Sequence, residues 1–181
     1  MRIPLALAIL FSASAAFGAD ACQKQIPQSL KAALANAFPK FRTPLVTDNL
    51  QEDNEYSLKH GGTSCIAVAS GDFNGDGETD YVLGLTERKG PGALIVVALA
   101  SGQSWRWKVL NQWKGDRMRL FVGTEKAGVY TRTLSLDGPL EKGEVEKLVC
   151  RTALPAFGMT ESTEVAYCYA GGKWLHVWVS D

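Results

Sequence analysis

The sequence predicts a mainly β protein with antiparallel strands and one N-terminal helix. Short apolar runs recur at spacings of about 10 to 14 residues, with glycine, proline or charged residues between them. Gly171 and Gly172 stand between two alternating segments near the C-terminus, a pattern typical of a tight hairpin turn. These two observations favour an all-β domain over an α/β one.

The expected helix covers residues 26–38. Pro27 stands near its start and Pro39 at its end, where proline is tolerated or stops a helix. Apolar residues recur at every fourth position and would share one helix face. They are Ile26, Leu30, Leu34 and Phe38.

The strands are expected in the rest of the chain, where apolar runs alternate with turn residues. Their ranges are 64–70, 80–87, 92–100, 105–113, 117–123, 128–136, 145–152, 163–170 and 173–181. Residues 136–144 are rich in glycine, proline and charge, which predicts a loop.

Residues 1–18 have the pattern of a secretory signal peptide, with one early arginine, a short apolar run and then small residues. Cleavage is expected after Gly18, with Ala19 and Ala21 as alternative positions. The apolar run is too short for a permanent transmembrane anchor. Residues 19–181 are then expected to form a single domain, located in the periplasm or secreted.

Charge excludes two classes of partner. The chain has 19 basic and 19 acidic residues, so its formal net charge is zero. Without Arg2 the net charge would be about −1, which gives no strong field to attract nucleic acid or anionic lipid. The sequence leaves the oligomeric state open.

Four cysteines fit an oxidising compartment: Cys22, Cys65, Cys150 and Cys168. They allow three connectivities, of which we favour Cys22 with Cys65 and Cys150 with Cys168. Alternatively Cys22 is acylated, which would leave Cys65 unpaired. The absence of a CxxC pair excludes a zinc knuckle.

Residues 72–80, DFNGDGETD, crowd oxygen atoms between two expected strands. Each pair of carboxylates about 4 Å apart repels by roughly 4 kcal/mol at an effective dielectric constant near 20. A cation would remove this cost, and calcium accepts such irregular oxygen sets better than magnesium does. Gly77 would permit the bend around the ion. The expected ligands are the side chains of Asp72, Asn74, Asp76 and Asp80 and the main-chain carbonyl of Glu78. The alternative is a polar turn without an ion.

The loop is not an EF-hand, because position 12 is Leu83 and no helices flank it. The strand–loop–strand segment 69–84, ASGDFNGDGETDYVLG, instead resembles the FG-GAP repeat of integrin-type β-propellers. That resemblance implies a calcium-bearing hairpin with these same ligands. Since only one such loop occurs, a closed propeller is not expected. The chain would instead form a blade-like pair of sheets or incomplete β-propeller, or a compact sandwich.

A second resemblance spans more of the chain. The helix, the segment FPKFRTP, the GDFNGDGETDY hairpin, the cysteines and the final GGKWLHVWVSD strand are similar to small periplasmic lysozyme-inhibitor and effector-immunity proteins. This resemblance implies a protein partner, a peptidoglycan hydrolase whose active site is blocked, and no chemistry by this chain. The alternatives are a binding module for cell-wall glycan or a surface protein, and an unrecognised hydrolase.

Residues for catalysis are sparse. No GxSxG elbow accompanies the two histidines, His60 and His176. The acidic residues Glu141, Glu144 and Glu146 are expected on a solvated loop face. We therefore expect no enzyme, although a carboxylate pair depends on the fold and not on sequence spacing.

Two tryptophan-containing segments are candidate contact surfaces. Trp105 and Trp107 would share one face of a strand whose other face is basic, and Trp174 would share a face with His176 and Trp178. Either set anchors a protein interface or is packed in the core as part of an amphipathic strand.

Overall fold

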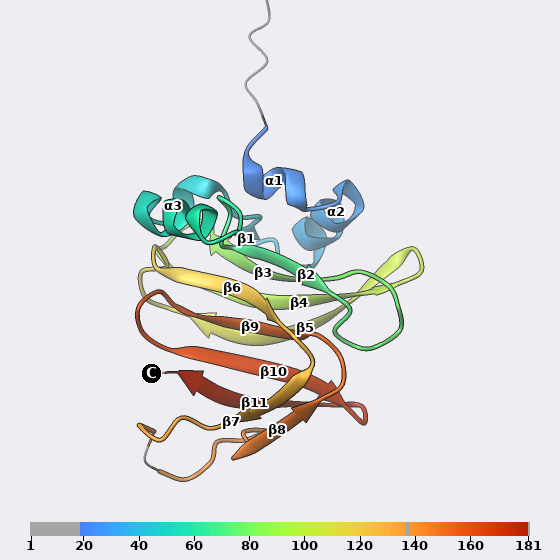
Figure 1. Cartoon of the computed structure of the whole chain (residues 1–181). Coiled ribbons are helices and arrows are strands. Elements are labelled where there is room, and N and C mark those ends of the chain that lie inside the picture. Colours follow the sequence, from blue (N-terminus) through green and yellow to red (C-terminus); the bar gives the residue numbers. More distant parts are fainter. Residues whose placement is uncertain (1–18, 137, 181) are drawn as a thin grey trace, which may run out of the picture.

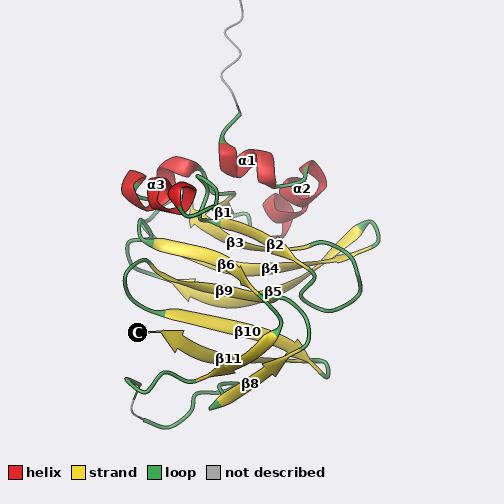
Figure 2. Ribbon diagram, viewed as in Figure 1, coloured by secondary structure: helices red, strands yellow, loops and turns green. Residues whose placement is uncertain are grey.

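The structure is a computed structural model that describes residues 19–136 and 138–180; the expected signal peptide, 1–18, lies outside the described residues. The described chain is mainly β, and its elements lie in layers (Figures 1 and 2). Helices cover one sheet, that sheet packs on a second sheet, and a two-stranded ribbon lies beyond the second sheet. The mainly antiparallel fold class is confirmed.

The first sheet has strand order β1-β3-β4-β5, and β2 pairs with the same edge of β3 as β1 does. All its ladders are antiparallel. Its strands are β1 (Phe41–Arg42), β2 (Val68–Gly71), β3 (Asp80–Glu87), β4 (Ala93–Ser101) and β5 (Ser104–Trp113).

The second sheet has strand order β11-β10-β9-β6, and the ribbon pairs β7 with β8. These ladders are antiparallel too. The strands of the second sheet are β6 (Leu120–Glu125), β9 (Leu154–Met159), β10 (Glu164–Ala170) and β11 (Lys173–Ser180), and those of the ribbon are β7 (Gly128–Thr131) and β8 (Lys147–Cys150). The layers are stacked and do not close into a ring, so a propeller is not confirmed.

Three α-helices occur in the described residues, against one expected: α1 (Ala21–Gln25), α2 (Gln28–Ala37) and α3 (Gln51–Lys59). Pro27 separates α1 from α2, because proline is favoured at a helix start and lacks the N–H that a continuous helix would need there. The helix α3 was missed because its only buried residue is Asn54, so the sequence shows no apolar stripe.

Three buried clusters hold the layers together. The first lies between α1, α2 and one face of the first sheet, the second between the two sheets, and the third between the second sheet and the ribbon. In the second cluster Ile95 and Val97 of β4 meet Val122 and Phe157 of the second sheet. These contacts make one body of the four layers.

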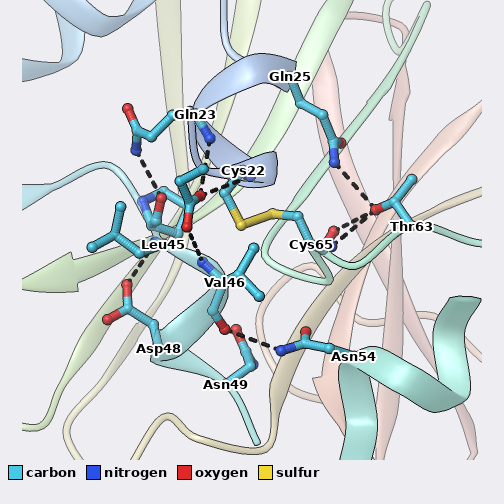
Figure 3. Close-up of a disulfide and its surroundings, with 12 residues drawn as sticks. Cys22, Gln23, Gln25, Leu45, Val46, Asp48, Asn49, Asn54, Thr63 and Cys65 are labelled. Carbon is cyan, nitrogen blue, oxygen red and sulfur yellow. Dashed lines mark hydrogen bonds between the residues drawn. A yellow bond between two sulfur atoms is a disulfide. The ribbon is translucent and has the colours of Figure 1, made fainter. Parts of the chain in front are cut away.

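Both disulfides that we favoured are confirmed. Cys22 bonds to Cys65 and joins α1 to the segment before β2, while Cys150 bonds to Cys168 and joins the ribbon to β10. No described cysteine is free. Figure 3 shows how the first disulfide is enclosed: Gln25 of α1 donates to Thr63 Oγ1 (3.2 Å), and the amide of Cys65 donates to the same oxygen (3.1 Å).

Two strand expectations are wrong. β9 was not expected. It contains Pro155, but the ladder to β10 covers only Ala156–Gly158, so the missing N–H costs no bond there. The strand expected at 128–136 ends at Thr131, after which Arg132 turns toward Glu144.

Candidate functional site

The oxygen-rich loop joins β2 to β3, as the sequence predicts, and is closed by its own hydrogen bonds. Asp72 accepts bonds from three loop amides, those of Gly75 (2.7 Å), Asp76 (3.1 Å) and Gly77 (3.0 Å). Gly75 and Gly77 have φ of +80° and +83°, the left-handed conformation that glycine adopts without steric cost. The loop therefore curls around the Asp72 carboxylate.

Asp80, the last expected ligand, is fully buried where β3 begins. Its Oδ2 accepts a bond from the Phe73 amide (2.9 Å) and its Oδ1 accepts one from the Ala100 amide of β4 (2.8 Å). Burial, and then the nearby charges of Asp76 and Asp72, raise the pKa of Asp80 above its ordinary value. The carboxylates thus do lie close enough to interact.

The remaining expected ligands are more exposed. Asn74 donates to Asp76 Oδ2 (2.7 Å), while the other Asp76 oxygen accepts a bond from the Glu78 amide (2.9 Å). The Glu78 amide, followed by Asn74, holds the pKa of Asp76 below its ordinary value. The Glu78 carboxylate accepts a bond from Gly102 N (3.3 Å), which ties the loop to the β4–β5 turn.

The donors fit a hard cation chemically, since all are oxygens. Among the residues that the structure describes, however, no three acidic, histidine or cysteine side chains converge as a metal-binding group. Asp72 and Asp80 face backbone amides, and a cation would compete with Asn74 for Asp76 Oδ2. Asp72 Oδ1 accepts two of these bonds, whereas the other carboxylate oxygens of Asp72, Asp76 and Asp80 accept one each and keep a lone pair for a cation. By donor type the loop is therefore a candidate site for a hard cation, while its described side chains do not converge on one point.

The Trp174–His176–Trp178 face of β11 is packed and not an exposed strip. Trp174 and Trp178 pack into the cluster between the two sheets, and His176 stacks on Tyr167 with ring centroids 4.9 Å apart. Burial lowers the pKa of His176 below its ordinary value, although the charge of Glu144 opposes this. This face belongs to the core.

Glu144 corrects the expectation of a solvated acidic loop, because it is only 6% exposed. Its Oε1 lies 2.7 Å from Nε of Arg132, and its Oε2 accepts a bond from the Glu141 amide (2.8 Å). Burial alone would raise the pKa of Glu144, but the Glu141 amide and Arg132 hold it below its ordinary value. This pair fixes the loop between the ribbon strands, while Glu141 and Glu146 are exposed as expected.

Trp105 and Trp107 pack toward α2, so the amphipathic-strand interpretation holds for β5. Their rings contact Tyr81 and Phe38 edge to face, with centroids 5.9 Å and 5.5 Å apart. Both tryptophans also line an open groove of about 470 Å³ between α2 and the β4–β5 hairpin. The polar residues of this groove are Ser29, Asn36, Gln103 and Ser104.

A larger cleft, of about 870 Å³, lies where α3 faces β2 and β6. Its apolar lining comes mainly from the strands, namely Ile66, Val68, Phe121 and Val122. Its polar lining comes mainly from α3, the loop after it and the β9–β10 turn, namely Glu52, Asp53, Tyr56, Ser57, Gly62, Thr63, Cys65, Thr160 and Glu161. We call this the α3 cleft; its volume is that of an ordinary ligand site.

Polar contacts, and not apolar packing, hold α3 over the cleft. Asn54 donates to the Val46 carbonyl (3.0 Å), a bond that Figure 3 shows, and Asp53 accepts a bond from Thr160 Oγ1 (2.9 Å). The amide of Leu50, just before the helix, donates to the Met118 carbonyl (3.0 Å). Tyr56, which lines the cleft from α3, remains 65% exposed.

A buried ionic network fixes the segment that leads into α3. Asp48 Oδ1 lies 2.5 Å from Arg42 and Asp48 Oδ2 lies 3.3 Å from Arg117. Arg117 also donates to Asn49 Oδ1 (3.2 Å) and to Thr86. Burial alone would raise the pKa of Asp48, but its bonds, led by that from Arg42, hold it below its ordinary value.

Glu161, on the rim of the α3 cleft, is the one non-glycine residue at positive φ among the described residues, with φ of 59°. It lies in the tight β9–β10 turn, where Ser162 N donates to the Met159 carbonyl (3.1 Å). This conformation costs an L-residue about 1–2 kcal/mol, so it marks a position worth a functional explanation.

Sequence reasoning missed the α3 cleft altogether. Its apolar residues belong to strands that were expected, but its acidic residues come from a helix and a turn that were not. The only sequence signal was the run QEDNEY, with acidic residues at a helix start.

No protein family, curated protein or solved structure matches the chain. The resemblances described above therefore rest on their residues alone. Within the described part of the chain, no helix is long and apolar enough to cross a membrane.

The buried position of His176 predicts a pH dependence of stability. Because its pKa is lower in the folded state, the folded protein binds this proton less tightly than the unfolded chain. The free energy of unfolding should therefore be fully retained above the ordinary pKa of about 6.5 and fall as the pH drops toward the folded value, by at most about 1.4 kcal/mol per pH unit.

Urea unfolding at pH values from about 7.5 to 5.5 measures this slope. His176→Phe should flatten it while keeping the ring stack. Tyr167→Phe is the matched control, because burial raises the pKa of Tyr167 to about 12, far above the range. An equal slope in His176→Phe and in the wild type would contradict the assignment.

Proposed function

We propose that this chain is an exported, calcium-braced protein that binds another protein and inhibits it, without chemistry of its own. The α3 cleft carries this proposal, because it offers a preformed apolar surface large enough for an inserted side chain or loop. The two disulfides support export, since such bonds persist in oxidising compartments. The periplasm or the cell exterior is the proposed location.

The proposed target is a peptidoglycan hydrolase of the lysozyme type. The target class comes from the resemblance to lysozyme-inhibitor and effector-immunity proteins. A rigid body suits such a task, because preorganisation lowers the entropic cost of binding. Here Cys65, which lines the α3 cleft, is bonded to Cys22 of α1, and the buried Asp48 network fixes the segment that leads into α3.

Calcium has a bracing role in this proposal. The side chains of Asp72, Asn74, Asp76 and Asp80 and the carbonyl of Glu78 would hold it. It would offset the charges of Asp76 and Asp72, which add to burial in raising the pKa of Asp80. The loop would then be one blade-like hairpin of the FG-GAP kind within the layered fold.

Calcium should stabilise the protein measurably. A ligand at 100 times its Kd adds about 2.7 kcal/mol to the free energy of unfolding, so Tm should rise when calcium is added to chelator-treated protein. Asp76→Asn should weaken this response, because it removes an exposed charge but retains an oxygen for the Glu78 amide. The control is Glu146→Gln in an exposed loop. An unchanged Tm together with no heat of calcium binding would remove the metal from the proposal.

Inhibition can be tested directly with purified hydrolases. Lysozymes, lytic transglycosylases, amidases and endopeptidases are assayed by the clearing of a cell-wall suspension, with the mature chain added at equimolar concentration. We expect at least one class to be inhibited, and Tyr56→Ala to reduce that inhibition about fivefold or more, as expected for an interface aromatic worth at least about 1 kcal/mol.

Val129→Ala is the matched control, since Val129 is exposed on β7 in the ribbon, beyond the second sheet from α3. Full activity of every hydrolase in the presence of the chain would reject the inhibitor function.

The groove at Trp105 and Trp107 favours a second candidate function, a binding module for cell-wall glycan. A sugar ring has apolar C–H faces and a polar rim, which match an aromatic ring flanked by amides and hydroxyls. Asn36 and Gln103 supply the amides here, and both are exposed.

Co-sedimentation with insoluble peptidoglycan tests this second candidate. The double variant Asn36→Ala/Gln103→Ala leaves the packed tryptophans intact and should cut retention about fivefold if each lost hydrogen bond is worth about 0.5 kcal/mol. Ser135→Ala, in an exposed loop, is the control. No retention of the wild type on the pellet would exclude the glycan function.

A further inference from the structure

The rim of the α3 cleft has one sign of charge. Of the residues that line the cleft, all of which are described, three are acidic and none is basic. Glu52 and Asp53 come from the first turn of α3, and Glu161 comes from the β9–β10 turn. The cleft therefore presents carboxylates from two elements above an apolar floor.

Arg119 neutralises this rim only in part. Its guanidinium lies 3.4 Å from Glu52 and 3.1 Å from Glu161. The side chains of both glutamates are largely exposed, at 72% and 84%. Such solvent-exposed pairs are weak, so a cation from outside can replace Arg119 at either carboxylate.

Glu161 has a conformation that glycine would adopt without strain. Its φ is 59°, so a residue with a long charged side chain stands at a turn position that glycine would suit better. Among the described residues, the Glu161 carboxylate makes only the exposed contact to Arg119. The strained residue thus holds an anion at the cleft mouth without a strong internal partner.

The floor and one wall suit the stem of a long basic side chain. Lys and Arg bury their methylene groups against apolar surface while the charged head stays near water. Ile66 and Phe121 are half-buried in the floor. Tyr56 lies on the helix side, where its ring is exposed but stacks on His60, with ring centroids 4.0 Å apart. A cation beside a tyrosine face gains further attraction.

We infer that the α3 cleft binds a basic side chain, arginine or lysine, of a partner protein. The methylene stem lies on the strand floor, and the charged head lies between Glu161 and the acidic first turn of α3. The partner is thus a protein with a basic residue on a protruding loop. This inference rests on the proposed function in one respect, namely that a protein occupies the cleft.

A peptide probe separates charge from apolar contact. The ¹⁵N-labelled mature chain is titrated with Ac-Leu-Arg-Leu-NH2 and with the same peptide carrying citrulline, which has the shape of arginine without its charge. We expect the amide shifts to cluster at Tyr56, Phe121 and Val122. The citrulline peptide should bind about fivefold or more weakly, and a rise in salt should weaken only the arginine peptide.

Two substitutions at one position distinguish binding from folding. Glu161→Gln should weaken the arginine peptide about fivefold and leave the citrulline peptide unchanged. Glu161→Gly should raise Tm, since it relieves the positive φ, and still weaken the arginine peptide. Glu141→Gln, in the exposed loop beside His176, is the matched control and should change neither.

Equal binding of the two peptides, shifts away from the cleft, or no binding would each overturn the inference. The hydrolase assay with the same variants separates it from the proposed function. If a hydrolase is inhibited equally by the wild type and by Glu161→Gln, the basic anchor is wrong and the inhibitor function stands. If no hydrolase is inhibited but the arginine peptide binds in the cleft, the chemistry of the cleft stands and the inhibitor function fails.

Discussion

Strand β4 is buried on both faces, and the layered fold depends on it. Leu94 and Val96 pack toward the helices, whereas Ile95 and Val97 pack toward the second sheet. A strand with one polar face is held in register by that face, because a slip of one residue would bury it. β4 has no such face over its buried length. Its register therefore depends on specific bonds, and the bond from the Ala100 amide to the buried Asp80 carboxylate is one of them.

Asp80 thus links the oxygen-rich loop to the core. Its two oxygens hold the loop at Phe73 and the end of β4 at Ala100, so the loop conformation and the β3–β4 register are set together. The network around Asp48 likewise holds the opposite end of β3. There Thr86 donates a hydrogen bond to Asp48 and accepts one from Arg117. Removing one partner of the Asp48 network would cost more than the network contributes, because it would leave a buried charge unpaired.

Apolar periodicity and turn chemistry predicted much of the fold. The hairpin at Gly171 and Gly172 is present, with φ of 57° and 79°. This turn needs positive φ at two successive positions, which glycine adopts most readily. The disulfides followed from chain order and spacing. By contrast, β9 and α3 left little signal, since β9 contains a proline, Pro155, and the one buried residue of α3 is an asparagine.

Of the two candidate sites, one could be predicted from the sequence and the other could not. The oxygen loop is local, so its residues could be recognised from nine consecutive positions. The α3 cleft combines residues such as Glu52, Phe121 and Glu161, which tertiary contacts alone bring together. The spacing of these residues in the sequence does not indicate that they lie close together.

The hydrogen bonds that Asp20 accepts would be kept or lost depending on where the expected signal peptide is cleaved. Its Oδ1 accepts a bond from the Cys22 amide (2.9 Å) as the N-cap of α1, and its Oδ2 accepts one from the Val46 amide (3.0 Å). Proteolysis after Gly18 or Ala19 would preserve this aspartate, and proteolysis after Ala21 would discard it and leave the disulfide-bonded Cys22 as the new first residue. Two of the three expected cleavage positions thus keep the N-cap of α1, and cleavage at the third would leave this helix without it.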